Sequence, residues 1–105
     1  MKDSIKEELV DKIISDLGPN FKKGDDDILR NYFDLYSPIA SDKSNRKIND
    51  EKLIPYIYNA VKQSYERRGD EGKSSSSEGS ISSTYIDIEE KLAKDVRSIR
   101  VVRWN

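Results

Sequence analysis

Hydrophobic residues recur with helical spacing in four separate stretches of the chain. The first stripe repeats every fourth residue and consists of Ile5, Leu9, Ile13 and Leu17. This spacing puts the side chains on one face of a helix. Ser4 and Glu7 have the spacing of a capping box, in which each side chain satisfies a free amide at the helix start. Gly18-Pro19 predicts its end, because glycine favours a left-handed cap and proline cannot continue the helix.

A second helix is predicted from about residue 26 to residue 36. Its apolar face consists of Ile28, Leu29, Tyr32, Phe33 and Tyr36. Asp25-Asp26-Asp27 supplies a cap and negative charge at the positive end of the helix dipole. Ser37-Pro38 predicts its end, because the residue before a proline is disfavoured in helical geometry. The mostly polar residues 40–49 predict an exposed loop with Ile48 as its aliphatic anchor.

The third stretch predicts the clearest helix, which begins near Leu53. Its apolar positions are Ile54, Ile57, Tyr58, Val61 and Tyr65. Pro55 fits the first turn, where its missing amide has no partner to lose, and a short turn capped by Asn49 or Asp50 is expected to precede it. Gly69 is expected to end the helix.

The rest of the chain combines a biased segment with a fourth helix. Residues 74–83 include seven serines and are expected to form either a flexible linker or an arm that orders against a partner. A helix is predicted over about 87–98, with Ile88, Leu92, Val96 and Ile99 on one face. The short β-prone tail after it carries Trp104, the only tryptophan. The sequence thus predicts a single all-α domain, a small bundle of about four helices with a Ser/Gly-rich loop or arm and an extended C-terminal tail. The first three helices fall in about 4–69, the arm in about 70–86, and the C-terminal helix and tail in about 87–105.

The composition indicates a thin hydrophobic core. The chain has 105 residues, of which 34% are hydrophobic and 37% charged, while globular domains have about 45–50% and about 25%. A folded chain with so little apolar mass is expected to have partners that cover part of its surface. The net charge of −1 gives no global reason to expect nucleic-acid or membrane binding. No apolar run approaches the roughly 18 residues of a membrane span, so a soluble component is expected.

Catalytic and metal chemistry find little support among the residues. Histidine and cysteine, the commonest general base and the strongest nucleophile, are both absent, so no enzyme is expected. The side chains of Asp25-Asp26-Asp27 diverge by about 100° each on a helix and do not converge on one ion. The segment from Asp42 to Glu51 lacks the glycine of a calcium loop at its sixth position, where Lys47 stands. We therefore expect neither a metal ion nor a cofactor.

Two features near the C-terminal end suggest contact with a partner. Basic residues recur every third position, at Lys91, Lys94, Arg97, Arg100 and Arg103. They form either an ordinary solvated helix face or a spiralling stripe that touches DNA phosphates or an acidic protein. Trp104 either covers the chain's own core or anchors the tail in a neighbour's pocket. For the basic residues the solvated helix face is favoured, and for Trp104 the interface is favoured. The candidate partner-binding tail consists of Arg97, Ile99, Arg100, Val101, Val102, Arg103 and Trp104.

A specific motif begins at the end of the third predicted helix. The run Tyr65-Glu66-Arg67-Arg68-Gly69-Asp70-Glu71-Gly72 is followed by Ser75, Ser77, Glu78, Gly79, Ser82 and Tyr85. This pattern resembles the head–tail connector family of tailed bacteriophages, also called DNA-packaging or head-completion adaptor proteins. The resemblance covers about residues 53–88, and the polar loop at 40–49 is longer than the family's pattern. The motif residues are Arg67, Arg68, Gly69, Glu71, Gly72, Ser75, Ser77, Gly79, Ser82 and Tyr85.

The resemblance implies a mostly helical structural subunit of the virion. Such subunits assemble in the host cytoplasm into a ring beneath the portal protein, with a dodecamer expected, and extend the DNA channel. Implied partners are the portal, neighbouring copies of the chain, the next neck or tail protein, and packaged DNA that passes without sequence specificity. No cofactor and no membrane are implied. The C-terminal tail would reach a neighbouring neck component, with the portal expected.

Two other functions are kept open. A small helical DNA-binding regulator would need a short turn between two helices, whereas the first two predicted helices are separated by residues 18–24. The acidic start of the second helix would also repel phosphates. A phage assembly factor that never enters the virion is the other alternative.

Overall fold

Four α-helices make up most of the chain. A computed structural model describes the backbone of residues 1–71 and 78–101, and the side chains of residues 1–67 and 87–101. The α-helices are α1 (Asp3–Leu17), α2 (Asp26–Ser44), α3 (Ile54–Glu71) and α4 (Glu78–Arg97). Two 3-10 turns, η1 (Gly18–Asn20) and η2 (Glu51–Leu53), lie between them. The described residues contain no strand, so the predicted all-α bundle of about four helices is confirmed.

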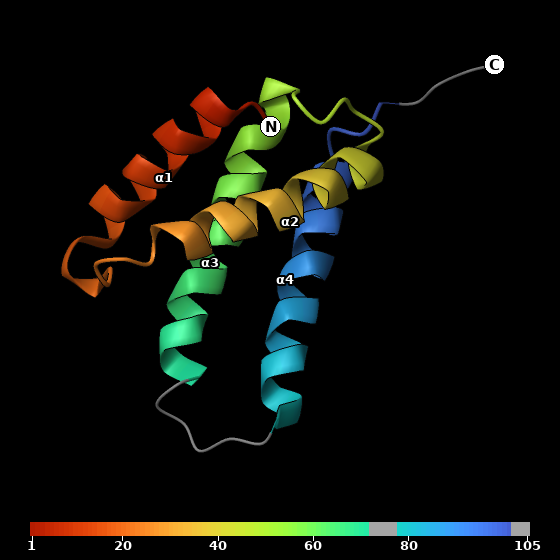
Figure 1. Cartoon of the computed structure of the whole chain (residues 1–105). Coiled ribbons are helices and arrows are strands. Elements are labelled where there is room, and N and C mark those ends of the chain that lie inside the picture. Colours follow the sequence, from red (N-terminus) through yellow and green to blue (C-terminus); the bar gives the residue numbers. More distant parts are fainter. Residues whose placement is uncertain (72–77, 102–105) are drawn as a thin grey trace.

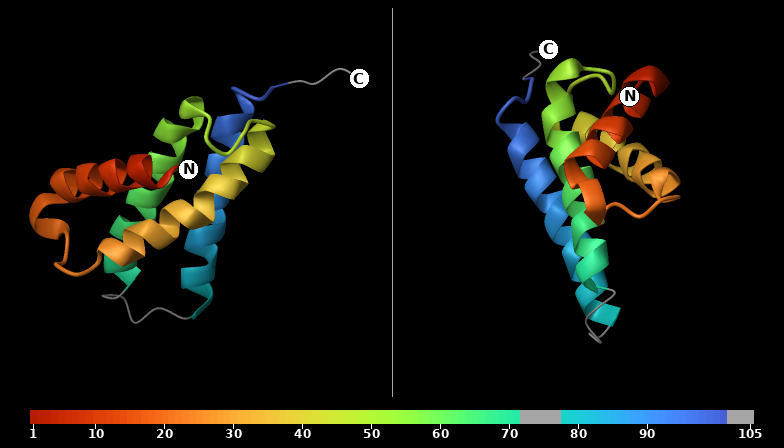
Figure 2. Two further views of the ribbon diagram at one scale, coloured as in Figure 1. Left: turned by 45° about the horizontal axis from the view of Figure 1, so that its top comes forward. Right: turned by 90° about the vertical axis from the view of Figure 1, so that its left-hand side faces the viewer.

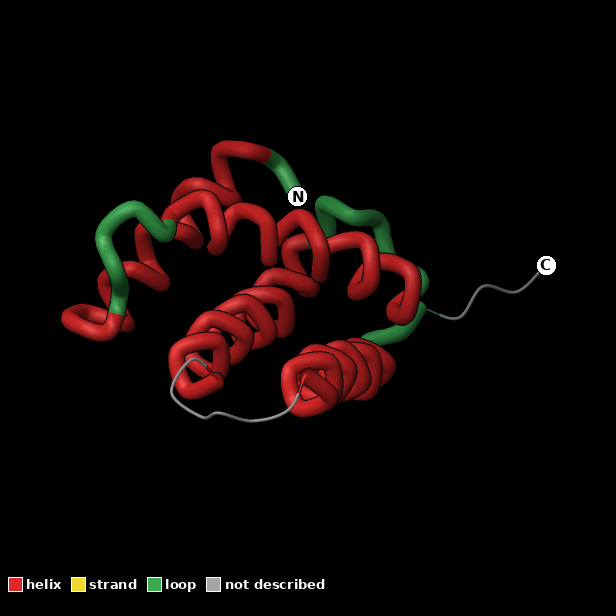
Figure 3. The backbone as a smooth tube through the Cα atoms, turned by 60° about the horizontal axis from the view of Figure 1, so that its bottom comes forward, coloured by secondary structure: helices red, strands yellow, loops and turns green. Residues whose placement is uncertain are grey.

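The helices form two layers. The antiparallel pair α3 and α4 makes one layer, and α2 crosses it, contacting both helices (Figure 1). The outer helix α1 packs on α2 and α3. Further views show the two layers from the side and almost along the axes of α3 and α4 (Figures 2 and 3). One face of the α3–α4 layer is thus covered by the first two helices.

The core lies between the layers and contains most of the predicted apolar positions. Its members are Val10, Ile13, Leu17, Leu29, Tyr32, Phe33, Tyr36, Ala40, Leu53, Ile57, Ala60, Val61, Tyr65, Ile88, Leu92 and Val96. The hydroxyl of Tyr36, which has no exposed surface, lies 2.6 Å from the Ser64 hydroxyl. That pairing satisfies polar groups whose burial would otherwise cost about 1–3 kcal/mol. Tyr58 is half-buried, so all four tyrosines expected in or beside the core lie there.

The ends of α1 are only partly as predicted. It ends at Leu17, as the Gly-Pro signal predicts, but Gly18 has φ of 54° and ψ of −124° and is not the expected left-handed cap. The capping box is wrong, because the helix begins at Asp3 and Lys2 occupies the N-cap position without a side-chain cap. Glu7 instead accepts two hydrogen bonds from Arg30 on α2, at 2.8 and 3.1 Å. The carboxylate therefore joins two helices.

The loop before α2 is fastened to α3 by Tyr65. Its hydroxyl accepts a hydrogen bond from the Lys22 amide at 3.0 Å and donates one to the Asp25 carboxylate at 2.7 Å. Asp25 occupies the predicted N-cap position of α2, but its side chain makes no capping bond there. Asp26 and Asp27 do lie in the first turn, where their charge favours the helix dipole.

The predicted end of α2 at Ser37-Pro38 is wrong, because the helix continues through proline to Ser44. Ala40 and Ser44 in the additional turns are fully buried, and this packing outweighs the missing backbone hydrogen bond at Pro38. The Ser37 hydroxyl also bonds the Phe33 carbonyl at 2.7 Å. The predicted loop at 40–49 therefore shrinks to residues 45–50.

Replacing the exposed Pro38 by alanine is expected to stabilise the protein. The substitution restores an amide that can complete the helix, and alanine is the best helix former. We expect Pro38→Ala to raise the free energy of unfolding by about 2 kcal/mol after the greater freedom of the unfolded chain is subtracted. Urea denaturation followed by circular dichroism measures the change. A lower denaturation midpoint would contradict this account of α2.

The start of α3 is as predicted, and the boundaries around the serine-rich segment are not. The Asp50 carboxylate accepts a hydrogen bond from the Lys52 amide at 2.9 Å and thereby caps η2. α3 begins directly after η2, at Ile54, and Pro55 lies in its first turn. Gly69 does not end α3, since an interior glycine costs a helix only about 1 kcal/mol. α4 begins at Glu78, not near 87, which takes residues 78–86 out of the predicted arm, and α3 takes residues 70 and 71. An acidic residue at a helix N-terminus and serine's modest helix penalty allow this start.

Candidate partner-binding surface

The candidate tail leaves the bundle across the turn that follows α2. α4 ends at Arg97, and Ile99 still packs against the core. The Val101 amide then donates to the Ser44 carbonyl at 2.9 Å. Asn45 Nδ2 donates to the Val101 carbonyl at 3.0 Å, and Arg46 Nε donates to the Ile99 carbonyl at 2.7 Å. Three hydrogen bonds from distant residues thus hold the base of the tail.

The turn that holds the tail is a C-cap of α2. Asn45 has a left-handed backbone with φ of 55°, a conformation that asparagine tolerates better than most residues. The Arg46 amide donates to the Ser41 carbonyl at 3.2 Å, and the Ser41 hydroxyl returns a bond to the Arg46 carbonyl at 2.5 Å. We call residues Ser44, Asn45 and Arg46 the tail clamp.

Arg46 is fixed from its other side by Asp50. Arg46 Nη1 lies 3.0 Å from Asp50 Oδ2, and both side chains are largely shielded from solvent. The amide of Lys52, and then Arg46, lower the pKa of Asp50 by bonding its charged form. The carboxylate therefore stays ionised at neutral pH and holds the guanidinium against the Ile99 carbonyl.

Removing the Arg46 side chain is expected to loosen the base of the tail. In Arg46→Ala the Ile99 carbonyl loses a charged donor, and we expect the Val101 amide to exchange its proton at least about tenfold faster. Hydrogen exchange followed by NMR measures that rate. Arg97→Ala is the matched control, because Arg97 is exposed and has no ion pair or side-chain hydrogen bond within the described part of the chain. Equal exchange rates in both variants would contradict the clamp.

The predicted basic residues of α4 lie on the surface. Lys91, Lys94, Arg97 and Arg100 are exposed, and none pairs with an acid among the residues whose side chains are described. Lys91 lines a hollow between α3 and α4 with Tyr56, Asn59 and Asp95. Arg103, Val102 and Trp104 lie outside the described residues. Four of the five basic positions are therefore available to a partner.

The family motif lies at the connection between α3 and α4. Arg67 is exposed, and Arg68, Gly69 and Glu71 continue α3. The motif positions within α4 are Gly79, Ser82 and Tyr85. Gly72, Ser75 and Ser77 lie outside the described residues. The structure thus places the motif at one end of the helix pair and the tail clamp at the other end (Figure 1).

The tail was identifiable from the sequence, whereas its clamp was not. Asn45 and Arg46 fall within the segment predicted as an exposed loop. The tail residues that their side chains bind, Val101 and Ile99, are more than 50 positions away in the sequence. The one local signal is the asparagine after a stretch of helix-compatible residues, which is typical of a left-handed C-cap. This signal applies only because α2 continues past Pro38 and ends at Ser44.

The described residues contain neither a group of metal-binding side chains nor a membrane-spanning helix. Among the described residues, no group of acidic side chains could hold a metal ion. In that part of the chain, no helix is both long and apolar enough to cross a membrane. No family model, curated protein or solved structure matches the chain. The chemistry of the surface therefore has to be interpreted from its own residues.

Proposed function

We propose that the chain is a structural head–tail connector subunit of a tailed bacteriophage. In this proposal, copies form a ring beneath the portal protein in the virion, with twelve as the expected number. The ring extends the DNA channel and joins the filled capsid to the next neck or tail protein. The role is structural, without catalysis, and DNA passes the ring without being read. The sequence motif from Arg67 to Tyr85 is the origin of this proposal.

The strongest support for the proposal is that two candidate contact regions, the motif and the tail clamp, lie far apart on the subunit. The motif lies at the α3–α4 connection, and the tail clamp lies where α4 ends (Figure 1). The 18 residues of α3 correspond to about 27 Å of helix, so the two regions are well apart. A subunit that joins different neighbours needs such separate surfaces. A small domain that binds one ligand at one pocket does not.

The surface and the core also suit assembly into a ring. The hydrophobic fraction is only 34%, and apolar side chains such as Leu35, Ile48 and Val101 remain between 37% and 45% exposed. Neighbouring subunits would cover such side chains and add stability. An interface between two different surfaces of identical chains closes into a ring when its rotation divides a full turn.

The composition of purified particles tests this function against that of an assembly factor. A connector is expected in the virion at a fixed copy number close to that of the portal protein. Quantitative mass spectrometry of purified particles measures both proteins. A protein that is abundant in the lysate but missing from particles would favour the assembly factor.

A DNA-binding regulator remains the second candidate because of the exposed basic residues on α4. Lys94, Arg97 and Arg100 could contact phosphates, and such binding weakens steeply with salt. The acidic first turn of α2 argues against the usual arrangement of a recognition helix. A mobility shift with duplex DNA that disappears at higher salt and depends on sequence would favour the regulator.

A further inference from the structure

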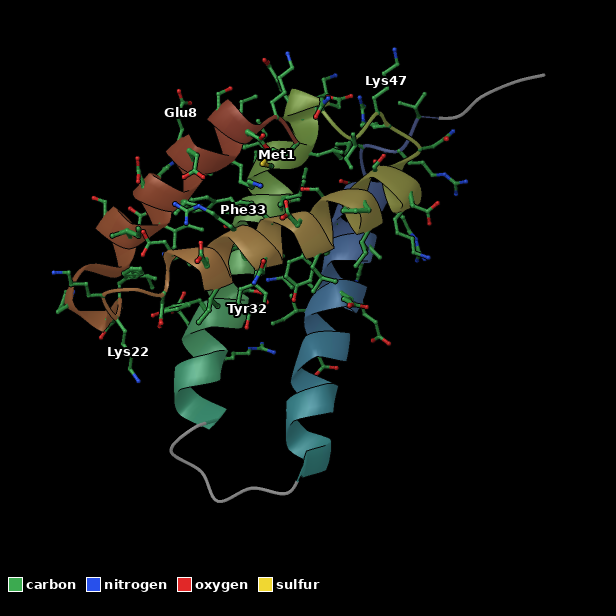
Figure 4. All side chains as sticks on the ribbon, viewed as in Figure 1. Met1, Glu8, Lys22, Tyr32, Phe33 and Lys47 are labelled. Atoms are coloured by element: carbon green, nitrogen blue, oxygen red, sulfur yellow. The ribbon has the colours of Figure 1, made fainter. Side chains whose placement is uncertain are left out.

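The outer face of α1 carries negative charge that the described residues leave unpaired. Ser4, Glu8, Asp11 and Ser15 follow one another at spacings of four, three and four residues, which puts them on one face of the helix. All four are exposed, and Figure 4 shows Glu8 pointing away from the bundle. Neither carboxylate has an ion pair or a side-chain hydrogen bond in the described part of the chain. We call these four residues the acidic ridge.

Both lysines of α1 engage other groups of the same subunit. Lys6 pairs with Asp34 on α2 at 3.2 Å and with Asp3 at 3.7 Å. The Lys12 ammonium lies 5.1 Å from the centre of the Tyr58 ring on α3. α1 contains five acidic residues and these two lysines, so its net charge is −3. The lysines lie along the edges of α1 that contact its neighbours, and the acidic ridge keeps its charge.

The C-terminal half of α4 and the residues just after it have the opposite charge. Lys91, Lys94, Arg97 and Arg100 are exposed and have no ion pair in the described part of the chain, and we call them the basic ridge. Residues 91–101 contain these four cations and one acid, Asp95, so their net charge is +3. The net charge of −1 for the whole chain therefore conceals two faces of opposite sign.

The two ridges lie on different sides of the subunit. α1 packs on α2 and α3, and α4 packs on the same two helices, so that α3 lies between α1 and α4 (Figures 1 and 2). Glu8 and Asp11 are three residues apart, as are Lys94 and Arg97, so each pair rises about 4.5 Å along its helix. The charges therefore match in sign and spacing, and one subunit cannot bring its own two ridges together.

We propose that the acidic ridge of one copy binds the basic ridge of a second copy of this chain. The inference rests on the proposed ring and deepens it, because it assigns the faces by which neighbouring subunits meet. A contact between two different faces propagates from copy to copy and closes when its rotation divides a full turn. Nucleic acid also fits a basic ridge, but it gives the unpaired acids on α1 no partner.

The contact selects the faces that meet more than it sets the affinity. An exposed ion pair strengthens an association by about fivefold or less. Complementary charges speed the encounter of the right faces, while like charges keep the wrong ones apart. An apolar anchor at Trp104 would add to the affinity separately. Because salt at about 0.5 M reduces the screening length to about 4 Å, the contact between the ridges is expected to weaken as salt rises.

Charge reversal in the purified full chain tests the contact. The variant Glu8→Lys/Asp11→Lys makes the acidic ridge basic. The variant Lys94→Glu/Arg97→Glu makes the basic ridge acidic. We expect each to self-associate at least about tenfold more weakly than the wild type, because repulsion replaces attraction between copies. Analytical ultracentrifugation over a range of protein concentrations measures the association constant, and circular dichroism checks that each variant folds.

A mixture of the two variants separates a contact between copies from an effect within one copy. One variant has two basic ridges and the other has two acidic ridges, so each repels itself and attracts the other. We expect the equimolar mixture to regain association to within about threefold of the wild type. Asp42→Lys/Glu66→Lys is the matched control, because it reverses two exposed acids outside the ridges and is expected to keep wild-type association.

Several results would overturn the proposal. One is a wild-type chain that stays monomeric, or whose association is unchanged at about 0.5 M salt. Others are a mixture that associates no better than its two components and a control that weakens association as much as the ridge variants do. A monomeric wild type that binds duplex DNA, and loses that binding in Lys94→Glu/Arg97→Glu, would assign the basic ridge to nucleic acid instead.

The outcome is separate from that of the proposed function. A chain that is monomeric in solution but present in purified particles at the copy number of the portal protein rejects the contact between the ridges and keeps the connector. A chain whose two variants associate only when mixed, but which is absent from particles, keeps the contact and rejects the connector. Ultracentrifugation and mass spectrometry of particles therefore decide the two proposals independently.

Discussion

Phe33→Ala is expected to remove a large part of the stability of this protein. Phe33 has no exposed surface and lies on α2, the helix that contacts each of the other three (Figure 4). Truncating a buried phenylalanine costs about 3–5 kcal/mol, because the transfer of apolar surface is lost and a cavity remains. A domain of this size is stable by about 5–15 kcal/mol, and this chain has a smaller hydrophobic fraction than most.

Urea denaturation, monitored by far-ultraviolet circular dichroism, measures the loss. The control is Leu35→Ala on the same helix, whose exposed side chain should change the free energy of unfolding by less than about 0.5 kcal/mol. If the two substitutions had similar effects, α2 would not be the centre of the core. A change in denaturant slope without a change in midpoint would point to the unfolded state instead.

A chain truncated after Val101 is expected to fold normally and to lose self-association. The truncation removes residues 102–105 and keeps every contact described for the clamp, including the Val101 amide on Ser44 and Asn45 on the Val101 carbonyl. Loss of one tryptophan anchor typically costs 2 kcal/mol or more, which weakens association by about 30-fold or more. Analytical ultracentrifugation measures the loss, and thermal unfolding checks that the fold is retained.

A truncation after Ser98 separates the tail from its clamp. This shorter chain also loses Ile99, which packs on the core, and is expected to melt at a lower temperature than the chain that ends at Val101. Both chains should fail to associate. A chain truncated at either position that still assembled normally would contradict the anchoring role of the tail.

The sequence predicted the helices wherever a periodic apolar stripe is also the buried face. Leu29, Phe33 and Tyr36 in α2, and Ile88, Leu92 and Val96 in α4, follow such stripes and are all buried. Glycine and proline were less informative. Gly18 ends α1, but Pro38 and Gly69 lie inside helices, because the packing of the flanking turns outweighs a local penalty of about 1–3 kcal/mol.

The candidate surface was predicted in part. Basic residues are visible in the sequence, and the exposure of Lys91, Lys94 and Arg97 follows from the face of α4 that the apolar stripe leaves free. The clamp was not predictable, because Arg46 and the Ile99 carbonyl are 53 residues apart and meet only through the packing of α2 on α4.

Electron microscopy of a phage that lacks this gene tests the central claim most directly. The account predicts DNA-filled or leaking heads beside separate, complete tails, because the head–tail joint would be missing. Supplying the full chain from a plasmid should restore joined particles, and supplying the chain truncated after Val101 should not. Normal infectious particles without the gene would contradict the connector function and leave the DNA-binding regulator as the better explanation.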